Sequence, residues 1–238
     1  MHGFPGTPHL PRVPPRLIAD APPAYRAGVF LAVLVALQFG YPVTLYGTAY
    51  GAAYQLAYAS LFVVGAWATG RAVFDSALAV ASAVGFAAAG AWYLLAEPSA
   101  QLPQLATYAA LIPFEVSLIR SLWGYVREPG HAGLTNLFSA VSVYLLLGAL
   151  FVPVYGLLEA VAPGSFVDGA APDEPLAWQQ LQYYSFVTLN TVGFGDVRPV
   201  SAWARALSNL EALAGVLYVA VTITHLVGAF RGPGAREL

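Results

Sequence analysis

Five residues late in the chain, Thr-Val-Gly-Phe-Gly at 191–195, have a composition suited to cation binding by the backbone. Gly193 and Gly195 have no Cβ, so the chain can adopt backbone conformations here that other residues resist. Successive carbonyl oxygens can then point to one side, and the hydroxyl of Thr191 can add one more oxygen at the inner end. Four such ladders around an axis could replace the water shell of a dehydrated monovalent cation.

This segment resembles a known ion filter. The potassium-channel filter consists of four Thr-Val-Gly-Tyr-Gly loops, and 191–195 differs from that motif only by Phe194 in place of Tyr. From about 134 to 231 the sequence resembles the pore domain of the tetrameric potassium channel family, in the order outer helix, turret, pore helix, filter and inner helix. The family resemblance, rather than a derivation from the residues, implies that K⁺ binds at Thr191, Val192, Gly193 and Phe194.

The resemblance also implies a set of residues that support the filter. They lie on the pore helix or directly after the filter: Trp178, Tyr183, Tyr184, Thr188 and Asp196. In the family the aromatic members form a cuff around the filter; the alternative is anchoring at the membrane interface. For Asp196 we expect a structural partnership with Trp178 or Tyr184, and the alternative is a ring of charge that attracts cations.

Two departures from the family pattern lie next to the filter. Phe194 lacks the hydroxyl that ties the usual Tyr to the cuff, and Val187 stands where some family members have a carboxylate. Both changes remove restraints behind the filter, while the carbonyl groups are kept. We therefore expect retained K⁺ selectivity with a filter less rigid than in Tyr-containing members.

Three residues of the inner helix are candidates for gating or for lining the cavity. Gly215 lies 20 residues after Gly195. In the family a glycine at about this place is the point where the inner helix bends in gating. Close packing against the pore helix would also explain a glycine there. Thr222 shares a helix face with Gly215 and is expected to line the cavity. His225 titrates near neutrality, which permits a proton-sensing gate, although a packed or snorkelling histidine is the alternative. Glu211 is expected to be buried behind the filter and hydrogen-bonded.

The composition is that of an integral membrane protein. Of the 238 residues 58% are hydrophobic and only 9% are charged, against about 25% charged in soluble domains. The formal net charge of −2 gives no footprint for nucleic acid. The absence of cysteine excludes disulfides and thiolate metal sites. We expect no cofactor; K⁺ enters only as the permeating ion.

Apolar stretches long enough to cross a bilayer, about 20 residues each, predict six spans. They are expected at about 27–46, 50–70, 72–96, 105–125, 134–158 and 203–230. A pore helix is expected at about 176–189, because Asp173, Glu174 and Pro175 resemble a helix start. The predicted fold is therefore an all-α integral membrane protein, with four transmembrane helices followed by outer helix, pore helix, filter and inner helix.

These elements divide the chain into four parts. Residues 1–24 form a Pro-rich, disordered cytoplasmic tail without the apolar core of a signal peptide. Residues 25–130 form a four-helix transmembrane region, residues 131–232 the pore domain, and residues 233–238 a short cytoplasmic tail.

Arginine placement orients the protein in the membrane. An even number of predicted crossings separates most of the arginines, so these can all be cytoplasmic: Arg12, Arg16, Arg26, Arg71, Arg120, Arg127, Arg231 and Arg236. We expect a multi-pass protein of the cell membrane with both termini in the cytoplasm and the filter loop outside.

The predicted fourth span lacks the arginine repeat of a voltage sensor. Each gating charge gains about 2.3 kcal/mol per 100 mV, and this span offers only Arg120 and, at its end, Arg127. We therefore expect weak voltage dependence or none. Glu115 in the same span is a functional candidate; a structural pair or a neutral carboxyl is the alternative.

One filter segment per chain implies a homotetramer, in which three identical subunits and membrane lipid are the partners. The predicted function is passive, K⁺-selective conduction, and the alternative is a non-selective monovalent cation channel of the same architecture. An enzyme would need a cluster of histidines and carboxylates, whereas Glu115, Glu211 and His225 are scattered. We expect no enzymatic activity, no nucleic-acid partner and no organic substrate.

Overall fold

The computed structural model of the chain describes residues 23–69, 77–96, 101–127 and 133–230, excluding the side chains of Tyr125, Arg127 and 225–230. Most of the predicted tail at 1–24 and all of the tail at 233–238 lie outside these residues.

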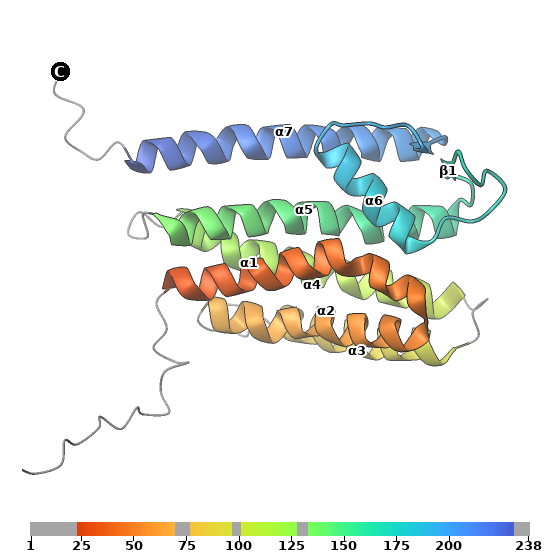
Figure 1. Cartoon of the computed structure of the whole chain (residues 1–238), viewed down its shortest axis with the longest axis horizontal. Helices are drawn as coiled ribbons and strands as arrows, with labels where there is room; N and C mark the ends of the chain where they lie inside the picture. The colour runs from red at the N-terminus through yellow and green to blue at the C-terminus, as the bar shows by residue number, and fades with distance from the viewer. Residues whose placement is uncertain (1–22, 70–76, 97–100, 128–132, 231–238) are drawn as a thin grey trace, which may run out of the picture.

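Six long helices run back and forth along one axis (Figure 1). They are α1 (Pro23–Gly40), α2 (Thr48–Ala68), α3 (Ala77–Leu95), α4 (Gln101–Arg127), α5 (Leu134–Val161) and α7 (Ala202–Phe230). The 3-10 helix η1 (Tyr41–Tyr46) joins α1 to α2, and the short helix α6 (Trp178–Leu189) lies between α5 and α7. The start of α1 and the end of α7 lie at one end of the molecule, opposite the loops around β1. The predicted all-α membrane class is confirmed.

Within the described residues, five helical segments are long and apolar enough to cross a membrane. They are Pro23–Tyr46, Ala77–Leu95, Gln101–Gly124, Leu134–Val161 and Ala202–Thr224. Helix α2 has 21 residues but is not among them, and its tyrosines and Gln55 lower its hydropathy. The chain is a multi-pass membrane protein, and six spans stay a prediction.

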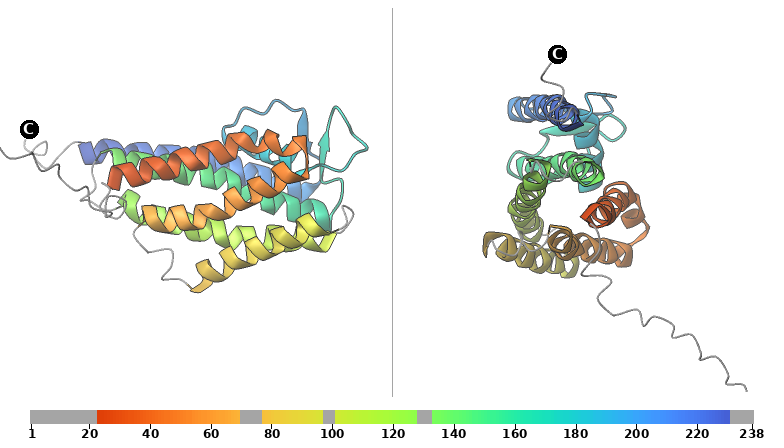
Figure 2. Two further views of the ribbon diagram at one scale, coloured as in Figure 1. Left: turned by 60° about the horizontal axis from the view of Figure 1, so that its bottom comes forward. Right: turned by 90° about the vertical axis from the view of Figure 1, so that its left-hand side faces the viewer.

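Helix α5 lies between the bundle of α1–α4 and helix α7 (Figure 2). One apolar core fills the bundle, around Phe30, Leu61 and Phe114. A second core, which includes Tyr155 and Leu181, joins α5 and α6 to the loops. The short helix α6, which ends at the filter, is therefore held from the side of α5.

Small residues let helices of the bundle come into close contact. A Cβ placed on Gly65 would lie 2.8 Å from the side chain of Leu118 on α4. On α3, a Cβ on Gly90 would lie 2.0 Å from the amide nitrogen of Gln55. These glycines therefore make room for neighbouring side chains.

A small antiparallel ribbon ties the turret to the segment after the filter. Strand β1 (Phe166–Asp168) pairs with β2 (Val197–Pro199), with Asp168 opposite Val197. This ribbon is not predicted from the sequence, because three-residue strands leave too short a pattern to detect. The acidic side chain of Glu159 accepts hydrogen bonds from the N–H groups of Gly164 and Phe166, at 2.7 and 3.0 Å. This turret carboxylate is thus part of the loop's structure.

Helix α6 begins at Trp178, two residues later than predicted. Asp173 and Glu174 lie in the loop ahead of it and are not in its first turn. The start is instead fixed by Gln180, whose side-chain carbonyl accepts a 2.7 Å hydrogen bond from the N–H of Ala177. This is the backward-reaching half of a capping box. The end at Leu189 agrees with the prediction.

Candidate functional site

The backbone of the filter segment alternates in conformation. Positive φ angles occur at Thr191 (56°), Gly193 (61°) and Gly195 (84°), that is, at every second residue. Alternation between left-handed and ordinary conformations turns successive peptide groups so that their carbonyl oxygens can share one side of the chain. The two glycines adopt this conformation without a steric penalty.

Thr191 adopts the same conformation at a cost. A β-branched residue with positive φ is a genuine outlier, and such strain amounts to about 1–3 kcal/mol and clusters at functional sites. Within the described residues, Thr191 is the only residue other than glycine with positive φ. Its neighbours therefore hold it in place.

Helix α6 supplies that restraint at the inner end of the filter. The N–H of Thr191 donates to the carbonyl oxygen of Thr188 at 2.9 Å, and the N–H of Val192 donates to the carbonyl oxygen of Val187 at 2.9 Å. Thr188, predicted as a supporting residue, acts here through its backbone. The filter thus continues directly from the last turn of the pore helix.

Tyr144 of the outer helix α5 is a second restraint, which the sequence analysis missed. Its hydroxyl lies 2.9 Å from Oδ1 of Asn190 and 3.4 Å from the carbonyl oxygen of Leu189. A polar residue within an apolar span was the available signal, but its partner lies 46 positions away in sequence.

At the outer end, Tyr183 connects the pore helix to the filter. Its hydroxyl donates a 2.8 Å hydrogen bond to Oδ2 of Asp196, and its ring lies parallel to that of Phe194, with 6.4 Å between centroids. The expected structural partners of Asp196, Trp178 or Tyr184, are therefore wrong; the partner is Tyr183. The hydrogen bond from Tyr183 lowers the pKa of the Asp196 carboxyl below its ordinary value.

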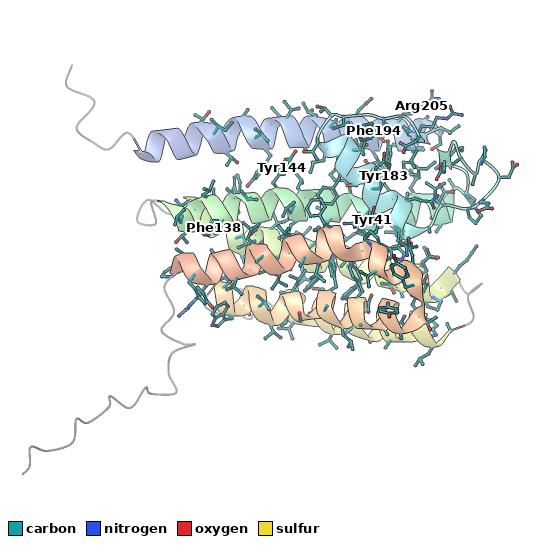
Figure 3. The ribbon with its side chains drawn as sticks, in the orientation of Figure 1. Tyr41, Phe138, Tyr144, Tyr183, Phe194 and Arg205 are labelled. Atoms are coloured by element: carbon teal, nitrogen blue, oxygen red, sulfur yellow. The ribbon has the colours of Figure 1, made fainter. Side chains whose placement is uncertain are left out.

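The other two predicted aromatic residues lie away from the filter. Tyr184 is buried, and its hydroxyl lies 2.5 Å from that of Ser208 on α7. Trp178 contacts Tyr41 and Tyr54, with ring centroids 6.2 and 5.5 Å apart. In Figure 3 Tyr41 lies on the side of α6 that faces α1, whereas Tyr183 and Phe194 lie toward α7. Of the aromatic residues expected to form the cuff, only Tyr183 therefore lies beside the filter within one subunit.

Glu211 lies fully buried behind the pore helix, and it is hydrogen-bonded as predicted. Ser185 of α6 lies 2.5 Å from its Oε1, and Tyr155 of α5 donates to its Oε2. Ser185 also lies 2.6 Å from the carbonyl oxygen of Gly148. One carboxyl group therefore joins α5, α6 and α7. Its partners Ser185 and Tyr155 are not predicted from the sequence.

The structure bears differently on each of the three candidate residues of the inner helix. A Cβ on Gly215 would lie 2.4 Å from the carbonyl oxygen of Leu189, so close packing against α6 is the supported reason for this glycine. Thr222 is only 8% exposed within one subunit. Tyr218, between them, donates a 2.7 Å hydrogen bond to the carbonyl of Ala140 on α5. The shared face of Gly215 and Thr222 thus packs inside the subunit, and the expectation that Thr222 lines the cavity is wrong. The side chain of His225 lies outside the described part.

The filter itself is uncovered in a single subunit. Phe194 is 70% exposed and Val192 is 53% exposed. Irregular backbone at membrane depth is tolerated only where protein surrounds it or where it lines a water-filled cavity. A filter exposed in this way in one subunit therefore needs either further protein around it or a water-filled cavity beside it. In the described part of the chain no cluster of three or more His, Cys, Asp or Glu could hold a metal.

A re-entrant pore helix followed by a carbonyl-bearing loop between two spanning helices defines the pore-loop class of ion channel. Residues 139–231 match the family described as "Ion channel", and this region is similar to pore-loop potassium channels.

Proteins whose names state their function match the same part of the chain. It is 32% identical over 100 residues to the inward rectifier potassium channel Kirbac3.1 of Paramagnetospirillum magnetotacticum, covering 40% of this chain and 30% of that protein. It is 31% identical over 90 residues to two pore potassium channel c of Oryza sativa subsp. japonica, covering 38% and 18%. It is 34% identical over 88 residues to potassium voltage-gated channel subfamily A member 6 of Mus musculus, covering 36% and 16%.

The chain thus spans less than a third of the length of each of these relatives. No solved structure matches the chain.

Proposed function

We propose that the chain is one subunit of a homotetrameric potassium-selective channel that conducts K⁺ passively through the membrane. The observation that carries the proposal is the alternation of positive φ at Thr191, Gly193 and Gly195. It fits a ladder of carbonyl oxygens at residues 191–194 as the K⁺ ligands. The protein performs no chemical reaction on the ion.

The end of α6 favours a cation at the inner side of this ladder. A helix carries a partial negative charge of about half an elementary charge at its C-terminus, and α6 ends at Leu189, directly before the filter. The relatives that match the region are named as potassium channels. Because each chain supplies one filter segment, four copies are needed to surround one ion.

A specific observation favours a second candidate, a non-selective monovalent cation channel. Phe194 has no hydroxyl with which to hold the filter, and its ring contact is with Tyr183 in the same subunit. If the filter widens easily, the carbonyl groups cannot discriminate between K⁺ and Na⁺.

The regions of the chain and their orientation in the membrane are assigned in keeping with this function. We assign residues 25–130 to a transmembrane region without a voltage sensor and residues 131–232 to the pore domain, between cytoplasmic tails at 1–24 and 233–238. The protein lies in the cell membrane, and both of its termini face the cytoplasm. Arg120 and Arg127 are the only basic residues of α4, so this helix offers little charge for voltage dependence. His225 and a hinge at Gly215 are the gating candidates, and such a hinge would have to move Gly215 away from the carbonyl oxygen of Leu189, against which it packs.

Ion flux through proteoliposomes tests the function. Vesicles with purified protein are loaded with KCl or NaCl, and the dissipation of each gradient is compared. We expect K⁺ flux that barium blocks and that Gly193→Asp abolishes, because a Cβ and a carboxylate disrupt the positive φ and the oxygen ladder. Equal K⁺ and Na⁺ flux would favour the second candidate. Flux that survives Gly193→Asp would contradict both.

A further inference from the structure

A cavity of about 410 Å³ lies between the first helices of the chain and the pore helix. Helices α2, α3 and α4 form most of its wall, and residues of η1, α5 and α6 complete it, with Trp178, Gln179 and Gln182 coming from α6. The volume falls within the range of about 300–1,000 Å³ that is typical of small-molecule sites. The pore function does not use this space.

The lining determines the kind of molecule that fits. Among the described residues that line it none is charged, and six are aromatic: Tyr54, Tyr58, Phe86, Tyr93, Tyr108 and Trp178. A charged ligand would lose its hydration without a partner of opposite charge, at a large cost in free energy. The cavity therefore suits an uncharged, flat apolar or aromatic molecule.

One polar group in the wall lacks a partner. The amide nitrogen of Gln55 is buried and has no hydrogen-bond partner among the described residues. It lies over Gly90, where the missing Cβ leaves the space that the amide occupies. A buried donor left unpaired costs about 1–3 kcal/mol, so a hydrogen-bond acceptor brought into the cavity would relieve that cost.

We propose that this cavity is a binding site for an uncharged lipophilic molecule that carries a hydrogen-bond acceptor such as a carbonyl oxygen. The acceptor pairs with the amide of Gln55, and the apolar part of the ligand packs against the aromatic rings. A ligand of this kind can enter from the bilayer, in which it is soluble.

The wall of the cavity is connected to the pore helix by hydrogen bonds. Tyr58 donates to Oε1 of the buried Glu115 at 2.5 Å and lies 3.4 Å from the amide nitrogen of Gln38. The side-chain carbonyl of Gln38 in turn accepts a hydrogen bond from Gln182 of α6. Occupation of the cavity therefore acts on the helix that ends at the filter. This regulatory part rests on the proposed channel function, whereas binding does not.

Photolabelling with benzophenone tests the binding, because benzophenone is an uncharged aromatic ketone that inserts into nearby C–H bonds when irradiated. Purified protein in lipid nanodiscs is irradiated, and the adducts are located by peptide mass spectrometry. We expect adducts on cavity residues of α2, α4 or α6. In Gln55→Leu, labelling at sub-saturating concentration falls by about three- to tenfold, corresponding to one lost hydrogen bond. Gln101→Leu, at an exposed position outside the cavity, keeps the wild-type level.

Diphenylmethane has the same shape without the acceptor, and it gives a test on the unmodified protein. We expect it to compete with benzophenone several-fold more weakly than a molecule with the affinity of benzophenone would, that affinity being taken from the concentration dependence of labelling. Equal competition would overturn the role of the acceptor, and adducts spread evenly over lipid-facing helices would overturn the site.

Flux assays separate the two parts of the proposal. We expect benzophenone at sub-saturating concentration to change the K⁺ flux of the wild type, and to have the same effect on Gln55→Leu only at a three- to tenfold higher concentration. Labelling without an effect on flux would overturn the coupling to the pore helix alone. If no condition gives K⁺ flux, the proposed function fails while labelling still decides the binding site.

Discussion

The hydroxyl of Tyr183 lies 2.8 Å from Oδ2 of Asp196, so the middle of the pore helix is joined to the residue that follows the filter. This bond restrains the outer end of the loop from within one subunit. Phe194, which lies against the ring of Tyr183, cannot provide a hydrogen bond of its own. We therefore expect the rigidity of the outer filter to depend on Tyr183 and Asp196.

Replacement of Tyr183 by Phe should loosen the filter. The change removes the hydroxyl while it keeps the ring, and a hydrogen bond to a charged acceptor contributes about 1.5–3 kcal/mol before solvent exposure reduces it. We expect the K⁺ current in planar bilayers to decay faster under a maintained gradient. Tyr46→Phe, at an 80% exposed position of η1, is the matched control. A decay rate equal to that of the wild type would show that the bond does not restrain the filter.

Replacement of Phe194 by Tyr should have the opposite effect. The added hydroxyl restores the group with which potassium-channel filters of the Thr-Val-Gly-Tyr-Gly type can bond to the residues behind them. We expect slower filter-based decay of the current and a K⁺-to-Na⁺ flux ratio at least as high as that of the wild type. A current that decays with the same time course as in the wild type would contradict this explanation of filter rigidity.

The Tyr183–Asp196 bond also makes a prediction about pH. Because this hydrogen bond lowers the pKa of Asp196, the carboxylate and its stabilising effect are fully present above the ordinary Asp value of about 4. They are lost as the pH falls through the lowered pKa. Current decay should therefore be constant from about pH 8 to 5 and should accelerate only below about pH 4 on the outer side. In Asp196→Asn this acceleration should disappear; its persistence would point to another group.

Gly215→Ala should weaken the contact between α6 and α7. The new methyl group would lie 2.4 Å from the carbonyl oxygen of Leu189, and such overpacking costs about 1–3 kcal/mol. We expect a lower thermal stability of the purified protein and reduced K⁺ flux. Gly124→Ala is the control, since nothing lies within 4 Å of its Cβ position and alanine favours a helix by about 1 kcal/mol. Equal stability of the two variants would contradict the packing account.

Much of the pore region could be predicted from the sequence because its signals are local. The glycines at 193 and 195 mark the backbone that requires positive φ, and the end of α6 was placed at Leu189. The buried, hydrogen-bonded state of Glu211 followed from its position one helical turn before Gly215.

The partners of these groups could not be predicted, because they come from distant parts of the chain. Tyr155 reaches Glu211 across 56 positions, and Tyr144 reaches Asn190 across 46. Thr222 was misplaced for a related reason: the helical period shows that it shares a face with Gly215, but not which neighbour that face meets. The side of α6 that Trp178 occupies depends on contacts with η1 and α2 in the same way.

The most direct test of the central claim is to locate a bound monovalent cation in the assembled protein. Rubidium can substitute for K⁺, and its anomalous scattering identifies it in crystals of the purified protein grown in RbCl. We expect a tetramer with Rb⁺ on the fourfold axis between the backbone oxygens of residues 191–194, and no such peaks in Gly193→Asp. A well-ordered assembly whose axis beside these residues holds no rubidium would contradict the account.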